Sequence, residues 1–471
     1  MVRHIIYFEW KNIIRNKAII WLVFTFLLIL GLSIYNGTSN INYQLENIKK
    51  CKQDEQQRFE NLLADIKKVE SGELKVNAYT NPKTPYMVGG KSGGHEIIKM
   101  PHDLSFISMG LSDYYPYHYQ ISLRNQQLFS FLMGDDRMEN PVNQLNSNFD
   151  LAFVLIWLLP LFIIAFSYNV LSSEKEQGTF KLLKAQPVSI TRILIIKILL
   201  RFVIIIGIIA ISICLFFSLF GVSIVDNITA IINLLSAISA YVLFWFMLSI
   251  LVNLFNKNSS INAGILFTSW LLIILIIPTL LNLVANYKYP VSTRIEYISF
   301  VRDATCEIDN NPDKVLDKYF SEHPELGTRK SENMPFWVYT VALKNKIVEE
   351  VSDSLIMKYK SQLNNQIEFI SYWKYFSPAI ILQQALDKLS GNSTNDFLKF
   401  QAKADEYNYK WRRCFFQKIL KDELLSKDDV LDLPRYSYEY EKENSIVTHS
   451  LFILACCVVV GGLIFLRKKF V

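Results

Sequence analysis

The sequence predicts a mainly α-helical protein that crosses a membrane six times and carries two large segments outside it. Of the 471 residues, 51% are hydrophobic and 14% are aromatic, which is too apolar for an ordinary soluble protein. Charged residues make up 20%, which is too many for a chain that lies entirely in lipid. The third observation is a set of apolar runs long enough to cross a hydrocarbon core of about 30 Å.

Six runs are the candidate spans: Ala18 to Tyr35, Leu151 to Leu171, Phe202 to Val225, Ile228 to Phe255, Ile261 to Ala285 and Ile446 to Leu466. Lysine and arginine precede the first span, separate the second from the third and the fourth from the fifth, and follow the sixth. The positive-inside rule therefore places both termini in the cytoplasm.

This topology divides the chain into membrane and water-exposed parts. Residues 36–148 and 286–445 lie outside as two extracytoplasmic domains. The remaining boundaries place an elbow helix at 1–17, spans at 18–35 and 149–171, a cytoplasmic segment at 172–192, three spans within 193–285, the last span at 446–466 and a cytoplasmic tail at 467–471.

The first residues predict a helix along the inner membrane surface. In HIIYFEWKNIIR one face holds Ile5, Ile6, Trp10, Ile13 and Ile14, and the other holds Lys11 and Arg15. The alternative is a basic flank that extends the first span. From Asn36 the chain turns polar but stays compatible with a helix over residues 45–69, which predicts a stalk that continues the first span outward.

The second external segment predicts two long amphipathic helices. Apolar residues recur every three or four positions in two series: Val351, Leu355, Tyr359, Leu363 and Ile367, then Phe397, Phe400, Ala404, Tyr407, Trp411 and Phe415. Ser377 and Pro378 break the first helix, and residues 391–394 form a turn before the second. An antiparallel helical bundle would bury both series.

Several patterns carry no clear chemistry. GGKSGG, residues 89–94, has Pro85 where a phosphate loop needs glycine, and no strand leads into it. The aromatic cluster Asp113 to Tyr119 fits either a packing or membrane-belt role or a surface that contacts substrate. His95, His102 and His118 lack the spacing of metal ligands, so we expect no metal.

Three cysteines fall in the external segments: Cys51, Cys306 and Cys414. An odd number without motif spacing predicts no disulfide framework, and we expect buried apolar side chains. A bridge between Cys306 and Cys414 stays open. Within the membrane, we expect Lys197 and Arg201 to reach back to the headgroups, and Ser236, Ser239, Ser249 and Asn253 to line a helix interface. Pro160 and Pro278 predict kinks.

The segment after the second span predicts a short helix at the membrane surface. Ser173 and Glu176 have the spacing of a capping box, and Pro187 ends the segment before the next span.

This segment, EKEQGTFKLLKAQPVS from Glu174 to Ser189, resembles the signature loop of type-2 ABC transporter permeases, in which a short cytoplasmic helix docks into a groove on an ATPase subunit. Four further strings resemble a branch of that superfamily with large external insertions: NPVNQLNSNFDLAFVLIWLLPL, SMGLSDYYPYHYQISL, FSPAIILQQALDKLSG and LPRYSY. Together they cover most of the chain but indicate no substrate.

The resemblance implies which residues couple the permease to its ATPase: Glu174, Glu176, Gly178, Thr179, Lys181, Leu182, Leu183 and Pro187. Leu182 and Leu183 would be the apolar centre of the contact, with Glu174, Glu176, Lys181 and Lys184 at its rim. No catalytic residue is expected in this chain, because ATP and Mg²⁺ would be bound by the separate ATPase. The alternative is a plain positive-inside loop with a capped helix.

The implied protein is a permease subunit of a bacterial inner membrane. Its expected partners are cytoplasmic ABC ATPase subunits, a second permease that is identical or paralogous, membrane lipid and a candidate partner in the periplasm, but no nucleic acid. It would export a substrate, or transmit ATP-driven motion to a periplasmic partner without moving a substrate. A different class, a membrane-anchored receptor or scaffold with no ATPase, remains the second alternative.

Overall fold

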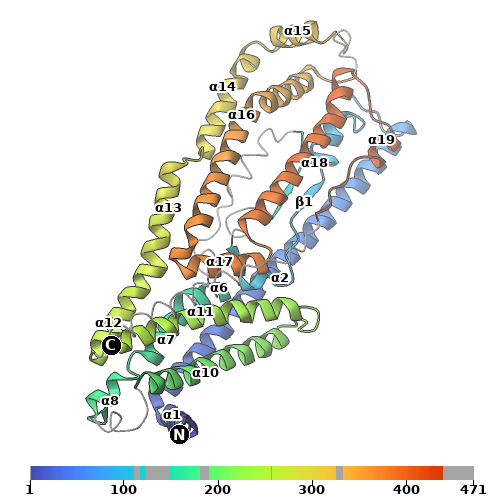
Figure 1. Ribbon diagram of the computed structural model, residues 1–471. Coiled ribbons are helices and arrows are strands. Elements are labelled where there is room, and N and C mark those ends of the chain that lie inside the picture. The colour runs from blue at the N-terminus through green and yellow to red at the C-terminus, as the bar shows by residue number, and fades with distance from the viewer. Residues whose placement is uncertain are drawn as a thin grey trace.

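The computed structural model describes residues 2–110, 117–123, 149–180, 190–255, 257–324 and 333–438. These residues are mainly helical, as the sequence predicts (Figure 1). Among them, five helices are long and apolar enough to cross a membrane. The predicted sixth span, 446–466, lies outside the described residues.

The first two helices meet at Asn16. Helix α1 (Val2–Arg15) is followed by α2 (Lys17–Glu70), and the Asn16 side chain accepts hydrogen bonds from Ala18 N at 3.1 Å and Ile19 N at 3.4 Å. Helix α2 contains the predicted first span and the predicted stalk without a break, as Figure 1 shows. With 54 residues it extends about 80 Å at the α-helical rise.

The membrane helices share one large apolar core. The second predicted span comprises α6 (Leu151–Phe153), η4 (Val154–Leu158) and α7 (Leu159–Ser167), followed by α8 (Ser172–Glu176). Next come α10 (Ile190–Leu219), α11 (Ile228–Leu254), and the continuous run of α12 (Ser259–Trp270), η5 (Leu271–Ile276) and α13 (Ile277–Lys288). Their buried side chains, among them Leu155, Ile209 and Trp245, form this core.

Both prolines of these helices follow a π-helical turn, and a hydroxyl from another element bonds a nearby carbonyl. Pro160 has no N–H for the carbonyl of Ile156, and Tyr241 Oη donates to that oxygen at 2.9 Å. Before Pro278, Ser377 Oγ donates to Ile273 O at 2.7 Å. Both prolines thus lie directly after π-helical turns, where tertiary contacts supply donors, and the predicted kinks stay a prediction.

The first external segment contributes short elements. They are α3 (Pro85–Met87), η1 (Val88–Ser92), η2 (Ser105–Ile107), and strands β1 (Glu96–Ile98) and β2 (His118–Gln120), which pair antiparallel with Ile97 opposite Tyr119. The GGKSGG string serves in packing here, because Gly89 O accepts from Trp411 Nε1 at 3.0 Å and from Leu123 N at 2.9 Å.

The second external segment is helical. It contains α14 (Arg294–Asn310), α15 (Pro312–Glu322), α16 (Phe336–Trp373), η7 (Lys374–Phe376), α17 (Pro378–Leu389), α18 (Thr394–Leu420) and α19 (Lys427–Leu431). The two long predicted helices correspond to α16 and α18, and the apolar series of α18 is buried from Phe397 to Phe415. One external core unites residues of both segments and the outer part of α2, including Ile66, Ile97, Leu343 and Trp411.

The external cysteines differ from the expectation. Cys306 and Cys414 are exposed free thiols, Cys51 is half-buried and free, and no bridge joins Cys306 to Cys414. The expectation of buried apolar side chains is therefore wrong for this group, because Cys306 and Cys414 lie on outward faces of α14 and α18.

Helix α17 joins the external part to the membrane helices. Its apolar residues, including Leu382 and Leu386, belong to the core of the membrane helices. Its carboxylate Asp387 accepts from Ser108 Oγ at 2.5 Å and from Gln383 Nε2 at 2.6 Å. At the start of α6, Asp150 Oδ2 accepts from Met109 N at 2.9 Å. The segment 108–110 thus lies between α17 and the second span.

We call the contact of residues 108–110 with α17 and with the start of α6 the joint. Glycine is required at position 110 of this joint. Its φ is +52°, in the left-handed region that favours glycine, and a Cβ would lie 2.8 Å from Asn392 O. Lys99 Nζ donates to Gly391 O at 2.9 Å and to Asn392 Oδ1 at 3.1 Å, closing the same joint. Three of the strings that carry the family resemblance therefore contact one another here.

The joint predicts a pH dependence of stability. Burial raises the pKa of Asp387 to about 6, against an ordinary value of about 4. Because the folded state holds this proton more tightly, the stabilisation is complete below about pH 4 and is lost as the pH rises through about 6. We expect a higher melting temperature at pH 5 than at pH 7.5.

Asp387→Asn isolates this contribution, because its Oδ1 still accepts from Ser108 and Gln383. Between pH 4 and 7, the free energy of unfolding of this variant should change by on the order of 2 kcal/mol less than that of the unmodified protein. Asp428→Asn, on the exposed first turn of α19, is the matched control and should leave it unchanged. Equal pH slopes for Asp387→Asn and the unmodified protein would contradict this account.

Candidate functional site

The predicted coupling segment begins in α8 and ends outside the described residues. Glu174, Glu176, Gly178 and Thr179 are described, whereas Lys181, Leu182, Leu183 and Pro187 are not. Gly178 has φ +77° and donates from its N–H to Lys175 O at 3.2 Å, which forms the turn after α8. Its left-handed conformation explains a glycine at this position.

The predicted capping box is wrong. No side chain caps the start of α8, whose N-cap residue is Leu171. The Glu176 carboxylate instead accepts from Ser259 N at 2.9 Å, and the hydroxyls of Ser172 and Ser259 lie 2.8 Å apart. Ser259 is the first residue of α12. Glu176 therefore fixes the coupling segment to the start of another membrane helix, because that helix end presents unpaired N–H groups.

Glu174 turns toward the membrane helices. Its Oε1 lies 2.7 Å from Lys197 Nζ on α10, and its Oε2 accepts from Thr179 Oγ1 at 2.5 Å. Two residues that the resemblance assigns to coupling thus contact each other, and one of them bonds a membrane helix.

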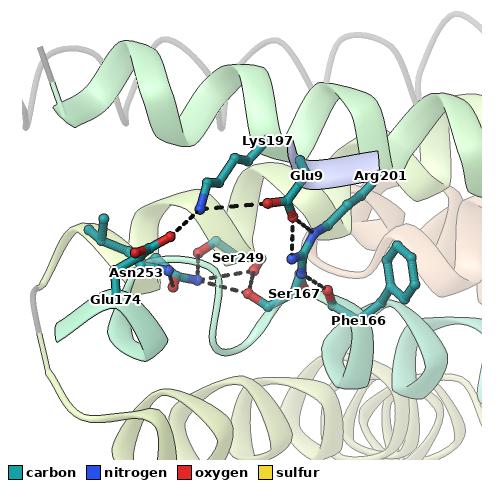
Figure 2. A network of polar contacts seen from close by, with 9 residues as sticks. Glu9, Phe166, Ser167, Glu174, Lys197, Arg201, Ser249 and Asn253 are labelled. Carbon is teal, nitrogen blue, oxygen red and sulfur yellow. Dashed lines mark hydrogen bonds and ion pairs between the residues drawn. The ribbon is translucent and has the colours of Figure 1, made fainter. Parts of the chain in front are cut away.

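The ion pairs continue from Lys197 to α1, as Figure 2 shows. Lys197 Nζ lies 3.6 Å from Glu9 Oε2, and Glu9 Oε1 accepts from Arg201 Nε at 2.9 Å and from Nη2 at 2.5 Å. Glu9 is 3% exposed and Arg201 is 6% exposed, so this pair is buried. We call Glu174, Lys197, Glu9 and Arg201 the ion network.

The expectation that Lys197 and Arg201 reach back to the headgroups is wrong. Both point into the protein, because Glu9 on α1 offers a carboxylate there. Sequence reasoning missed Glu9 as the partner of these two side chains. A signal was present, since Glu9 is the only acidic residue among the first 45. A single carboxylate on an otherwise basic and apolar helix needs a cationic partner if it is buried.

Polar side chains also complete the end of α7. Arg201 Nη1 donates to Phe166 O, and the guanidinium lies 5.4 Å from the Phe166 ring centroid. Ser167 O accepts from Asn253 Nδ2 at 3.1 Å and from Ser249 Oγ at 3.2 Å, while Asn253 Oδ1 accepts from Leu171 N at 3.3 Å. These donors satisfy carbonyls that the end of the helix leaves open.

The predicted polar interface is therefore confirmed for Ser249 and Asn253, both buried on α11. Ser236 and Ser239 instead donate to carbonyls of their own helix. The Asn253 side chain accepts from Leu171 N, and the Glu176 carboxylate accepts from Ser259 N. These two hydrogen bonds connect the start of the coupling segment to α11 and α12.

A cleft of 840 Å³ adjoins the ion network between α1, α10 and α8. Glu9, Glu174 and Lys197 line it, together with basic and apolar residues of α1. Helix α1 is amphipathic, as predicted. Trp10 and Ile14 are exposed, whereas Ile13 packs into the membrane core.

The described residues hold no group of three His, Cys, Asp or Glu side chains that could bind a metal. The three histidines of the first external segment have separate partners. His95 Nδ1 lies 2.5 Å from Glu55 Oε1, His118 Nδ1 lies 3.8 Å from Cys51 Sγ, and His102 Nδ1 accepts from Leu104 N at 3.3 Å.

The ion network predicts that one substitution will be strongly destabilising. Glu9→Gln leaves the Arg201 charge buried without a carboxylate, a change that costs about 3–5 kcal/mol in comparable buried pairs. We expect a clearly lower melting temperature in detergent. Lys11→Gln removes a charge from an exposed position of α1 and should have little effect. The double variant Glu9→Gln with Arg201→Met should recover part of the loss, and no recovery would argue against the pair.

Comparison with known proteins now adds to this geometry. The family model described as ABC-2 family transporter protein matches residues 3–470, nearly the whole chain. No curated protein and no solved structure matches this chain. The match agrees with the resemblance of the coupling segment and with the five apolar helices of the described part. The chain therefore belongs to the ABC-2 transporter family, as a multi-pass membrane protein and a permease subunit of an ABC transporter.

Proposed function

We propose that this permease couples ATP hydrolysis by a separate cytoplasmic ATPase to export, or to mechanical work on the outer side of the membrane. The observation that carries the proposal is the ion network. It connects Glu174 of the coupling segment to α10 through Lys197 and to α1 through Glu9. A displacement of the segment by an ATPase would therefore act directly on two helices.

We expect a displacement of the coupling segment to pass from α1 to α2 and then to the external core. This helix contacts both α10 and the beginning of α2. Helix α2 then continues without interruption to the external core, where Leu62 and Ile66 are buried. Since a helix without a break resists bending, a tilt imposed at Asn16 would reach the external part along about 80 Å of α2.

In this proposal the chain itself is not catalytic. ATP and Mg²⁺ are bound by the ATPase, whose groove receives residues 174–189. A second permease, identical or paralogous, completes the assembly in a bacterial inner membrane, with both termini in the cytoplasm. Residues 36–148 and 286–445 then face the periplasm, where a partner protein or a substrate is received.

The second candidate is mechanical transmission to a periplasmic partner without transport of a substrate. The continuity of α2 and the dense contacts of α17 with α11 favour it, because both are suited to transmitting force between the two sides. A scaffold without an ATPase is less consistent with membership of a transporter family.

One prediction of this proposal tests the contact with the ATPase. Leu182→Asp with Leu183→Asp places charge in a contact centre that should be apolar, at a cost of roughly several kcal/mol. We expect normal expression and membrane insertion but loss of the ATPase on co-purification. Lys257→Gln, an exposed residue between α11 and α12 that lies outside residues 174–189, is the control and should retain the ATPase. A double variant that binds the ATPase with unchanged affinity would place the contact elsewhere.

A second prediction tests the topology. In intact spheroplasts, an impermeant maleimide should label a variant that keeps only Cys306, which is exposed on α14. A cysteine-free variant with Lys175→Cys should be labelled only after lysis, because the positive-inside rule puts α8 in the cytoplasm. Labelling of position 175 in intact spheroplasts would overturn this orientation.

A further inference from the structure

The external part contains a cavity that the proposed function does not use. It has a volume of 280 Å³ and lies between α16 and α18, with Tyr86 and Leu123 at one end. Figure 1 shows these helices in the external half, far from α8. Its size lies near the lower end of the range for small-molecule sites, about 300–1,000 Å³. It therefore suits a compact ligand.

Among the residues that line this cavity, Asn345 has a buried amide that is only half satisfied. Asn345 of α16 is 6% exposed, and its Nδ2 donates to Leu123 O at 2.7 Å, which fixes the orientation of the amide. Its Oδ1 has no hydrogen-bond partner in the described part of the chain. Because an unpaired buried acceptor is unfavourable, a donor placed here by a ligand would be stabilising.

The charged residues of the cavity are mostly basic. Lys346 lies on α16, and Arg412 and Arg413 lie on α18, against the single carboxylate of Glu349. Lys346 also pairs with Glu350 at 3.3 Å on the outer side. Burial raises the pKa of Glu349, as do the carboxylates of Asp353 and Glu350, while the positive charges of Lys346 and Arg412 act in the opposite sense. The lining therefore carries an excess of two positive charges.

The rest of the lining is apolar and aromatic. Val341 and Ala342 come from α16, Phe416 and Ile419 from α18, and Tyr86 from α3. A fully hydrated inorganic anion would leave these surfaces without contacts. A ligand with an apolar body would instead cover them and gain from their burial.

We propose that the cavity between α16 and α18 binds a small organic anion with an apolar ring and one N–H or O–H donor. The anionic group faces Arg412 and Arg413, the ring lies against Phe416 and Ile419, and the donor bonds Asn345 Oδ1. This site does not depend on the ATPase contact, so it gives the external part a ligand-sensing or substrate-receiving role on either version of the proposed function.

Three matched probes test each part of this ligand by titration calorimetry on the full-length protein in nanodiscs. Indole-3-acetate has the anion, the ring and the N–H donor, and should bind. Naphthalene-1-acetate lacks the donor and should bind about fivefold more weakly, as expected for one hydrogen bond. Tryptamine replaces the anion by a cation and should bind at least about tenfold more weakly. Equal affinities, or no binding of indole-3-acetate at 1 mM, would overturn the proposal.

Two substitutions, one that removes a positive charge and one that removes a negative charge, test where the ligand binds. Arg413→Gln should weaken indole-3-acetate binding several-fold, and Glu349→Gln should strengthen it, because one removes an attractive charge and the other a repulsive one. Lys410→Gln removes a positive charge three residues from Arg413 that pairs with Glu406 and does not line the cavity, so it should change nothing. Unchanged affinity in both Arg413→Gln and Glu349→Gln would refute this location.

Lys346→Gln is a second weakening variant if Arg413→Gln proves unstable, because Lys346 is only partly buried. The Leu182→Asp, Leu183→Asp protein should bind indole-3-acetate normally. This result separates the two proposals, since loss of the ATPase contact leaves the external cavity intact, and loss of the cavity leaves the ATPase contact intact. If binding instead disappears in that variant, the cavity is not the independent site described here.

Discussion

A buried arginine determines how α1, α8 and α10 are assembled at one end of the membrane helices. Arg201 lies on α10 among apolar side chains, where an uncompensated charge would be very unfavourable. Glu9 neutralises it, and this places α1 against α10 instead of leaving it free on the membrane surface. Lys197 then extends the compensation to Glu174, so the coupling segment is held by the same electrostatic requirement. Any movement of one member has to preserve these pairs or replace them.

A related requirement acts within the membrane helices, where a carbonyl without an N–H partner needs another donor. Tyr241 on α11 and Ser377 beside α17 supply donors next to the two prolines. These contacts connect elements far apart in sequence. Ser377 is also the N-cap residue of α17, a helix of the second external segment whose apolar side chains pack into the core of the membrane helices. The contact at Pro160 thus connects two membrane helices, and the contact near Pro278 connects a membrane helix to the external part.

Hydropathy and charge predicted most of the helices but few of their contacts. The five described membrane helices, the stalk of α2 and the helices α16 and α18 follow from composition and periodicity, which are local. The ion network does not, because Glu9 and Arg201 are 192 positions apart and only packing reveals that they meet. The capping box at Ser173 failed for a similar reason, since a tertiary partner, Ser259, took the carboxylate of Glu176. The coupling role of residues 181–189 remains a prediction from resemblance.

The strings specific to this branch gain a physical meaning from the joint around α17. Ser108, Asp150 and Asp387 come from three such strings, and each bonds across an element boundary. A resemblance in these residues therefore reflects the need to fix the external part to the second span, whatever ligand that part receives. Helix α2 packs on η2, directly before this joint, and continues without a break into the external core, so a tilt of α2 relative to the second span would act on both. The cavity between α16 and α18 belongs to that core, so its shape would change with the tilt, and occupancy of the cavity would in turn bias the position of α2.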